Sequence, residues 1–239
     1  MTDILKIGSP EMVVGLRRNK RAKRLTLRVS SVDGKPVLTL PPRVTLRAAQ
    51  DFLMRQEKWL RERLSDAPTR VKVDIGVIIP FCGEKLVISQ HSKTRTVLAP
   101  GHIVVSANKH AGKSVSAFLK SRARLAATEH AQKYAAILGH EFNRISIRDP
   151  RSRWGSCSTE GNLMFSWRLV LAPEKVLEYV VAHEIAHLAE MNHSAAFWQT
   201  VAGLMPEYNQ FQKWLKLNGA TLHRLDFNAA LTRPQNVIT

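Results

Sequence analysis

The residues of this chain best suited to chemistry are three histidines and a glutamate between positions 183 and 193. His183 and His187 are four residues apart, so on a helix their imidazoles project from one face and can reach a single tetrahedral zinc ion. Glu184 follows the first histidine, where its carboxylate can take a proton from water at the metal without occupying a coordination position. This H-E-x-x-H spacing predicts a Zn²⁺ site with Glu184 as general base.

His193 is the predicted third ligand. The chain must turn for this side chain to face back, and we expect Met191-Asn192 to make the turn, because Asn tolerates the left-handed conformation that ends helices. Ser194 is then the expected N-cap of another helix. Three histidines leave the fourth zinc position to water, which distinguishes a catalytic zinc site from a closed structural one.

Two helices are predicted to position these residues. The first begins after Pro173, which suits a first helical turn, and carries one apolar stripe. The stripe comprises Leu177, Val181, Ile185 and Leu188. The second spans Ser114 to Gly139 and supports the zinc helix, with Ser114 at its start and Gly139 past its end. Strands are expected at 144–148 and 163–171, joined by a loop rich in Pro, Gly and Ser.

The N-terminal part reads as strands, a helix and more strands. The expected elements are strands at 12–14, 25–29 and 36–40, a turn at Asp33-Gly34, a helix over 46–64 capped by Thr45, and short strands within 71–107. The predicted fold class is therefore α+β. We expect a β-rich basic N-terminal part (1–110), a catalytic part with a zinc helix, a supporting helix and a small antiparallel sheet (111–225), and a tail (226–239).

Charge is unevenly distributed along the chain, whose net charge is +17. Residues 1–70 hold 16 Lys and Arg against 7 Asp and Glu, whereas residues 141–239 hold 10 against 9. The densest basic cluster runs from Arg17 to Arg24. Such asymmetry fits a polyanionic partner and a solvated basic face equally well. The cluster could contact phosphates, but a charged edge strand that resists aggregation is the simpler explanation for it.

Composition also limits the compartment. The sequence has no apolar run near the roughly 20 residues of a membrane span, and its N-terminus lacks the pattern of a signal peptide. Cys82 and Cys157 are far apart and give no disulfide framework. A cytoplasmic protein without membrane contact is therefore expected.

The motifs SRWGSCSTEGNLMFSWRLVLAP, VVAHEIAHLAEMNHSAAFW and MPEYNQFQKWL resemble the YgjP-like metallopeptidases, a family near the SprT-like and minigluzincin zinc proteases. The resemblance covers Arg144 to about Gly219, and NKRAKRLTLRV resembles the family more loosely. The histidine spacing also matches metzincins, but these have Gly three residues after the second histidine, where this chain has Glu190.

The resemblance implies a zincin-like fold and a zinc peptidase acting on a peptide or protein. It further suggests that the hairpin before the zinc helix receives substrate as an added strand. Arg153, Trp154 and Ser156 could line this cleft, although Trp154 also fits a core aromatic and Arg153 an ion-pair donor. Tyr208 could stabilise an oxyanion if it reached the cleft.

Three other functions can be compared with the features of this sequence. A nucleic-acid-associated protein is the alternative, and the two combine in SprT-like relatives that include proteases acting on DNA-attached proteins. A nucleobase deaminase would need a P-C-x-x-C ligand pair, which the sequence lacks. Cys157 does not match cysteine-protease signatures. The remaining histidines, at positions 91, 102, 110, 130, 140 and 223, have no partner at metal spacing.

Overall fold

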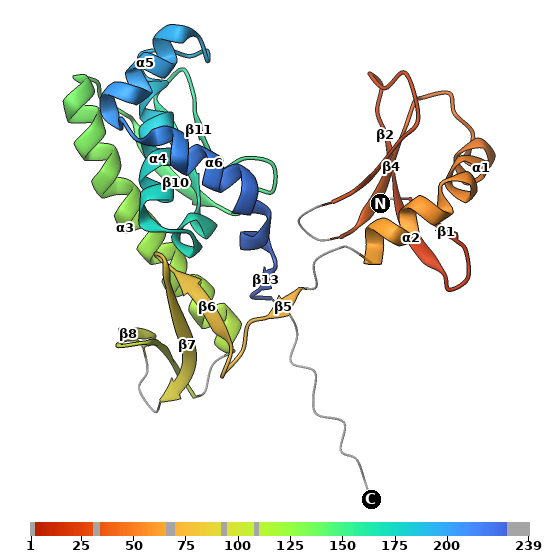
Figure 1. Ribbon diagram of the computed structural model, residues 1–239, viewed down its shortest axis with the longest axis horizontal. Helices are drawn as coiled ribbons and strands as arrows, with labels where there is room; N and C mark the ends of the chain where they lie inside the picture. Colours follow the sequence, from red (N-terminus) through yellow and green to blue (C-terminus); the bar gives the residue numbers. More distant parts are fainter. Residues whose placement is uncertain (1–2, 31–33, 66–69, 92–94, 108–109, 229–239) are drawn as a thin grey trace, which may run out of the picture. The chain divides into compact units, whose positions relative to one another are not determined.

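The computed structural model describes residues 3–30, 34–65, 70–91, 95–107 and 110–228 (Figure 1). Helices and several small sheets alternate along the chain, so the predicted α+β class is confirmed. The chain forms two compact units, residues 1–70 and 71–239. This division precedes the expected boundary at residue 110, because the strands after residue 71 share one core with the long helix that follows them.

The N-terminal unit is a four-stranded sheet with two helices. Its elements are β1 (Ile4–Ile7), β2 (Met12–Arg18), β3 (Thr26–Val29), β4 (Pro36–Leu40), α1 (Leu46–Arg55) and α2 (Glu57–Ser65), with strand order β1-β2-β4-β3. Thr45 caps α1 as expected, its hydroxyl accepting from the Ala48 N–H at 3.2 Å. One long helix was predicted here, but the helix is interrupted at Gln56, which is the C-cap of α1, and α2 begins at the next residue. Asp33 of the predicted turn lies outside the described residues.

The second unit begins with a sheet of order β6-β7-β9-β8. Its strands are β6 (Ile78–Phe81), β7 (Glu84–His91), β8 (Val97–Ala99) and β9 (His102–Ser106). The start of the unit, β5 (Val71–Lys72), pairs in parallel with β13 (Leu225–Asp226) near its end. This pairing brings the two ends of the unit together, so the strands from residue 71 belong with the C-terminal part.

A 28-residue helix, α3 (Ala111–Leu138), supports the helix that carries the histidines. It begins before Ser114 and ends as predicted at Gly139, whose φ of 69° is left-handed. Its contact with the histidine helix, α4 (Glu174–Ala186), includes a buried charge: Glu178 accepts from the Tyr134 hydroxyl at 2.7 Å and from Lys133 at 3.1 Å. α4 lies beside α3 (Figure 1), and the two helices pack through apolar side chains and this ionic network.

A second, three-stranded sheet precedes α4. Its strands are β10 (Arg144–Arg148), β11 (Gly155–Cys157) and β12 (Asn162–Ser166), in the order β10-β12-β11. β10 and β12 are parallel while β11 is antiparallel to β12, so the sheet is mixed rather than antiparallel as predicted. The expected strand over 163–171 ends at Ser166, and a 3-10 helix (Trp167–Leu171) follows.

The rest of the unit comprises α5 (Ala195–Leu204), α6 (Tyr208–Asn218) and a 3-10 helix (Gly219–His223). The Arg168 guanidinium links the C-terminal segment to the loop after β10. It donates two hydrogen bonds to the Asp149 carboxylate and two to the carbonyls of Leu222 and Leu225. In the part of the chain that the structure describes, no helix has the length and apolar character needed to cross a membrane.

Candidate metal centre

Helix α4 presents His183, Glu184 and His187 at its C-terminal end. The helix ends at Ala186 and His187 is its C-cap, so Leu188 lies in the following turn rather than on the helical stripe. The turn is held by hydrogen bonds from Leu188 N–H to Ile185 and from Glu190 N–H to Ala186. These bonds satisfy carbonyls that the helix end would otherwise leave unpaired.

Asn192 and Ser194 bring His193 back toward the helix. The Asn192 Oδ1 accepts from the Ser194 N–H at 2.9 Å, and the Ser194 hydroxyl accepts from the Phe197 N–H at 3.3 Å, capping α5 as predicted. Asn192 was expected in the left-handed conformation, but within the described ranges Cys82 is the only non-glycine residue with positive φ. The turn therefore depends on the Asn192 side chain instead of an unusual backbone conformation.

The three histidines predicted from spacing converge. One ring nitrogen from each lies within 4.8 Å of the others, and no other such group of His, Cys, Asp or Glu occurs in the described residues. The Nε2 atoms of His183 and His193 are 3.1 Å apart. His187 Nδ1 lies 2.9 Å from the Glu190 carbonyl oxygen, so Nδ1 carries the proton and Nε2 keeps its lone pair.

Aromatic side chains from helix α5 pack against the three imidazoles. Phe197, fully buried on α5, has its ring centroid 4.9, 4.5 and 4.7 Å from those of His183, His187 and His193. Trp198 stacks on His193 at 5.8 Å and on Tyr208 at 5.5 Å. Packing on several sides limits the rotation of each imidazole, which holds the nitrogens in place.

Burial sets the protonation of these groups. It lowers the pKa of His183 to about 4, with a further contribution from His187 and His193, and it also lowers the pKa of His187. Burial raises the pKa of Glu184 to about 8 in the metal-free chain, against the opposing effects of the Arg153 charge and the Cys157 N–H. The histidines that are buried are thus neutral at pH 7, as metal ligands must be.

Strand β11 lies directly against Glu184. A Cβ added to Gly155 would come within 2.5 Å of Glu184 Oε1, so this position has no room for a side chain. The Cys157 N–H hydrogen-bonds the same carboxylate. Burial and the Glu184 charge raise the pKa of the Cys157 thiol to about 11, which leaves it protonated and excludes it as an activated nucleophile.

A cavity of about 250 Å³ opens beside His183 and Glu184. Its other lining residues are Arg153, Trp154, Gly155, Tyr179, Val180 and Leu215. Arg153 and Trp154 therefore line the site. Trp154 also has the alternative role considered for it, because it packs against the hydrophobic core, with its ring centroid 5.1 Å from that of His223 and the two rings tilted by 34°. Ser156 lines a neighbouring hollow instead.

Tyr208 does not meet the condition for an oxyanion role, which was that it reach the cleft. Tyr179 lines the cavity, whereas Tyr208 stacks against Tyr179 and Trp198 and is not among the lining residues. Tyr179 is four residues before His183, so helical spacing placed it on the same face. That spacing was the signal that could have identified it.

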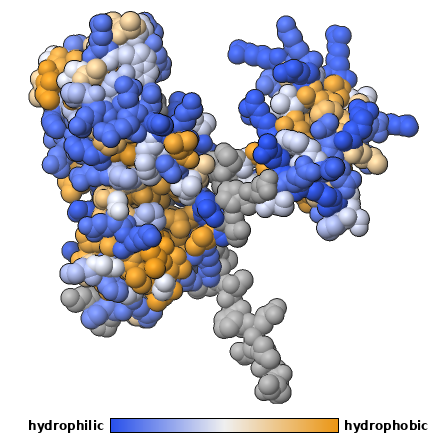
Figure 2. Space-filling model, in the orientation of Figure 1, coloured by the Kyte–Doolittle hydropathy of each residue, from blue (hydrophilic) through white to orange (hydrophobic). Residues whose placement is uncertain are grey.

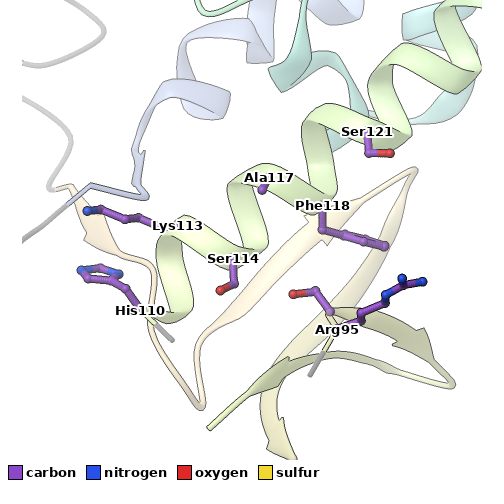
Figure 3. A pocket seen from close by; sticks show the side chains of 8 residues that line it. Arg95, His110, Lys113, Ser114, Ala117, Phe118 and Ser121 are labelled. Carbon is purple, nitrogen blue, oxygen red and sulfur yellow. The ribbon is translucent and has the colours of Figure 1, made fainter. Parts of the chain in front are cut away.

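A separate cavity of about 640 Å³ lies along the first turns of α3 (Figure 3). Arg95, Lys113 and His110 contribute cationic or titratable groups, and Phe118 contributes an apolar wall. It shares no lining residue with the metal centre.

Comparison with known proteins places the site in a family. A family model described as "YgjP-like, metallopeptidase domain" matches residues 23–218. A UTP pyrophosphatase of Escherichia coli (strain K12) is 44% identical over 41 residues, which are 17% of this chain and 25% of that protein. The match thus spans only a quarter of the length of this curated relative.

Two solved structures show weaker likeness. They are the metallopeptidase zymogens abylysin of Pyrococcus abyssi (22% identity, TM-score 0.35) and jannalysin of Methanocaldococcus jannaschii (18% identity, TM-score 0.35). Each similarity covers 38% of this chain and 95% of the other. Because the family model spans most of the chain, including all three clustered histidines and Glu184, the chain belongs to the YgjP-like metallopeptidase family.

Proposed function

We propose that this metallopeptidase-family chain is a zinc-dependent hydrolase, with His183, His187 and His193 as ligands and Glu184 as general base. The observation that carries the proposal is the convergence of three imidazole nitrogens beside a buried carboxylate at the wall of a cavity. Peptides or proteins are the substrate class that the family supports.

The donor set suits zinc. Two nitrogens bound to one tetrahedral zinc at about 2.0–2.1 Å lie about 3.4 Å apart, close to the 3.1 Å between His183 and His193. Three neutral imidazoles with an open fourth position are the ligands of catalytic zinc sites. When bound, zinc supplies a Lewis acid that polarises a carbonyl or phosphoryl oxygen and makes water more acidic.

Glu184 performs the proton transfers. Its carboxylate oxygen accepts a proton from the attacking water and delivers it to the leaving nitrogen of the cleaved peptide bond. The Cys157 N–H holds the carboxylate in one orientation, and the nearby Arg153 charge favours its ionised form. A cation held by the three histidines would favour ionisation further.

The substrate would bind along β11. This strand is at the edge of its sheet, and the Trp154 carbonyl and Ser158 N–H are paired with β12. In an antiparallel pair the intervening residues point their backbone groups away from the neighbour. The backbone groups of Gly155 therefore face outward, where an extended peptide can add as another strand next to Glu184.

A second candidate activity is hydrolysis of a nucleotide phosphoanhydride. The 44% identity with a stretch of a UTP pyrophosphatase favours it, and zinc with Glu184 is suited to hydrolysis of either bond. Assaying zinc-loaded protein against a peptide library and against nucleoside triphosphates distinguishes the two.

Nucleic-acid association through the basic N-terminal unit, with action on DNA-bound proteins, is a further candidate. Figure 2 shows long hydrophilic side chains extending from this unit. Arg17, Lys20, Arg21, Lys23 and Arg24 are exposed, and such a cluster can contact phosphates.

The experiment that tests the hydrolase is Glu184→Gln, with Glu174→Gln on the exposed start of α4 as matched control. The Gln variant should keep its zinc, since Glu184 is not a ligand, and lose about a hundred- to ten-thousandfold in hydrolysis rate. The control should keep both. A zinc-loaded Gln variant that hydrolyses at the parent rate would exclude Glu184 as the base.

A further inference from the structure

A hollow of about 490 Å³ lies on the outer face of the sheet β10-β12-β11, and arginines are among the residues that line it. Side chains alternate along a strand, so Arg144, Ser146 and Arg148 lie on one face of β10 while Ile145 and Ile147 pack on the core. Arg153, just before β11, also lines the hollow. Three guanidinium groups thus border one concave surface.

Arg144 and Arg148 are not paired with a carboxylate within the described structure, whereas Arg153 lies near the Glu184 charge. Neither Arg144 nor Arg148 makes a hydrogen bond or ion pair through its guanidinium with a described residue. The lining carboxylate, Glu160, instead accepts hydrogen bonds from Ser158 at 2.7 Å and Thr159 at 3.3 Å. Arg168 gives the contrast, because its guanidinium has a bidentate carboxylate and two carbonyl partners.

The hollow adjoins the metal centre. Arg153 lines both this hollow and the cavity beside Glu184. β11, which bears Ser156 in the hollow and Gly155 against Glu184, is the edge strand between them. A ligand that binds the arginines and crosses this edge therefore reaches the carboxylate.

We propose that the arginine hollow, defined by Arg144, Arg148 and Arg153, binds a chain of phosphate groups. Guanidinium forks bind phosphate oxygens in pairs, and the Ser156 hydroxyl offers a further donor. Arg144 and Arg148 are four residues apart on a strand, about 13 Å between their Cα atoms. Several linked phosphates supply charge along such a span, whereas one carboxylate supplies a single charge. Whether the bound phosphates are also hydrolysed depends on the hydrolase function proposed above.

The test measures binding separately from hydrolysis. Calorimetric titration of the full-length Glu184→Gln protein, in which hydrolysis should be suppressed, with α,β-methylene-ATP and with inorganic triphosphate, both in excess Mg²⁺, is repeated with the double variant Arg144→Gln, Arg148→Gln in the same background. Removal of two charge-assisted hydrogen-bonding groups should weaken binding by at least about tenfold. Equal affinity for the two probes would show that the phosphates alone are recognised. Tighter binding of α,β-methylene-ATP than of triphosphate would show that the nucleoside also makes contacts.

The matched control is Arg95→Gln, Lys113→Gln, which removes the same charge from the cavity on α3 (Figure 3). It should change affinity by less than about twofold. An equal loss of affinity in both double variants, or binding of a poly-glutamate peptide as tight as that of triphosphate, would overturn the proposal. If binding depends on the arginines but the parent hydrolyses neither peptides nor nucleotides, the hydrolase fails and the phosphate site stands.

Discussion

Gly155 lies so close to Glu184 that a Cβ on the glycine would fall 2.5 Å from Oε1 and 2.6 Å from Cγ of the glutamate. Real Cβ atoms essentially never approach other atoms so closely. Because the Cys157 N–H on the same strand bonds this carboxylate, β11 fixes the position of Glu184 through one close approach and one hydrogen bond. The strand thus positions the proposed base.

Gly155→Ala should therefore displace the Glu184 carboxylate. We expect zinc to be retained, because the three atoms nearest to the new methyl group belong to Glu184 and not to a histidine. Hydrolysis should fall by at least about tenfold, since a displaced base loses its share of proton-transfer catalysis. Zinc content and kcat on the same preparation test this.

Gly203→Ala is the matched control. Gly203 lies in α5 with open space around its Cβ position, so the substitution should leave activity unchanged and stabilise the helix by about 0.5–1 kcal/mol. Equal kcat values for Gly155→Ala and the parent would show that the carboxylate tolerates displacement.

The parts of the site predicted from sequence follow from local geometry. His183, Glu184 and His187 are on one helix, so their spacing determines their relative positions before any tertiary contact forms. Thr45, Ser194 and Gly139 cap helices as their side chains or backbone freedom predict. These features depend on a few neighbouring residues.

The missed features depend on contacts between distant segments. Nothing near Gly155 in sequence indicates that Glu184 lies against it, although a glycine in a strand signals a close approach in general. Tyr208 and Tyr179 stack on one another, and only the packing of α6 on α4 decides which lines the cavity. The boundary between the two units lies at residue 70 and not at 110 because β5 pairs with β13, at the other end of the second unit.

His193→Ala should reduce zinc affinity by more than the roughly 10–100-fold that loss of an outer hydrogen-bond partner costs. His193 comes from beyond the helix, so its removal leaves α4 and the Ser194 cap intact. Zinc content by mass spectrometry and circular dichroism together separate metal loss from unfolding. His140→Ala, at an exposed histidine after α3, is the control and should keep full zinc. Undiminished zinc in His193→Ala would exclude this residue as a ligand.

Glu178 makes stability depend on pH. Burial alone would raise the pKa of this carboxyl, but hydrogen bonds from Lys175, Tyr134 and Lys133 outweigh it and lower the pKa to about 2, from an ordinary value of 4.5. A depressed folded-state pKa stabilises the protein above pH 4.5, and this contribution is lost as pH falls from 4.5 through 2.

Glu178→Gln should therefore destabilise the protein by about 2 kcal/mol at pH 7, the value of a charge-assisted hydrogen bond. The difference from the parent should shrink at pH 3, where part of the parent's own advantage has gone. Urea unfolding at both pH values measures it. Glu129→Gln, exposed on α3, should match the parent at both, and a Glu178→Gln penalty that does not vary with pH would contradict the assignment.

The residues of the basic cluster in the N-terminal unit have two different roles. Arg18 donates hydrogen bonds to the carbonyls of Pro42 at 3.0 Å and Val44 at 2.9 Å, so it holds the chain between β4 and α1. The other five basic residues, Arg17, Lys20, Arg21, Lys23 and Arg24, are exposed and available to a polyanion.

Reversing the five exposed charges should leave the unit folded and, if it binds nucleic acid, weaken retention on DNA. The slope of log affinity against log salt should become shallower by about 1 for each phosphate that the variant no longer neutralises. Arg18→Glu should instead lower the unfolding temperature, because the carbonyls of Pro41, Pro42 and Val44 lose their donor, while its single charge change has a small effect on the salt dependence. Retention measured across a salt series, with thermal unfolding of each variant, separates these roles. Identical salt dependence in the parent and the five-residue variant would leave the cluster as a solvated strand edge.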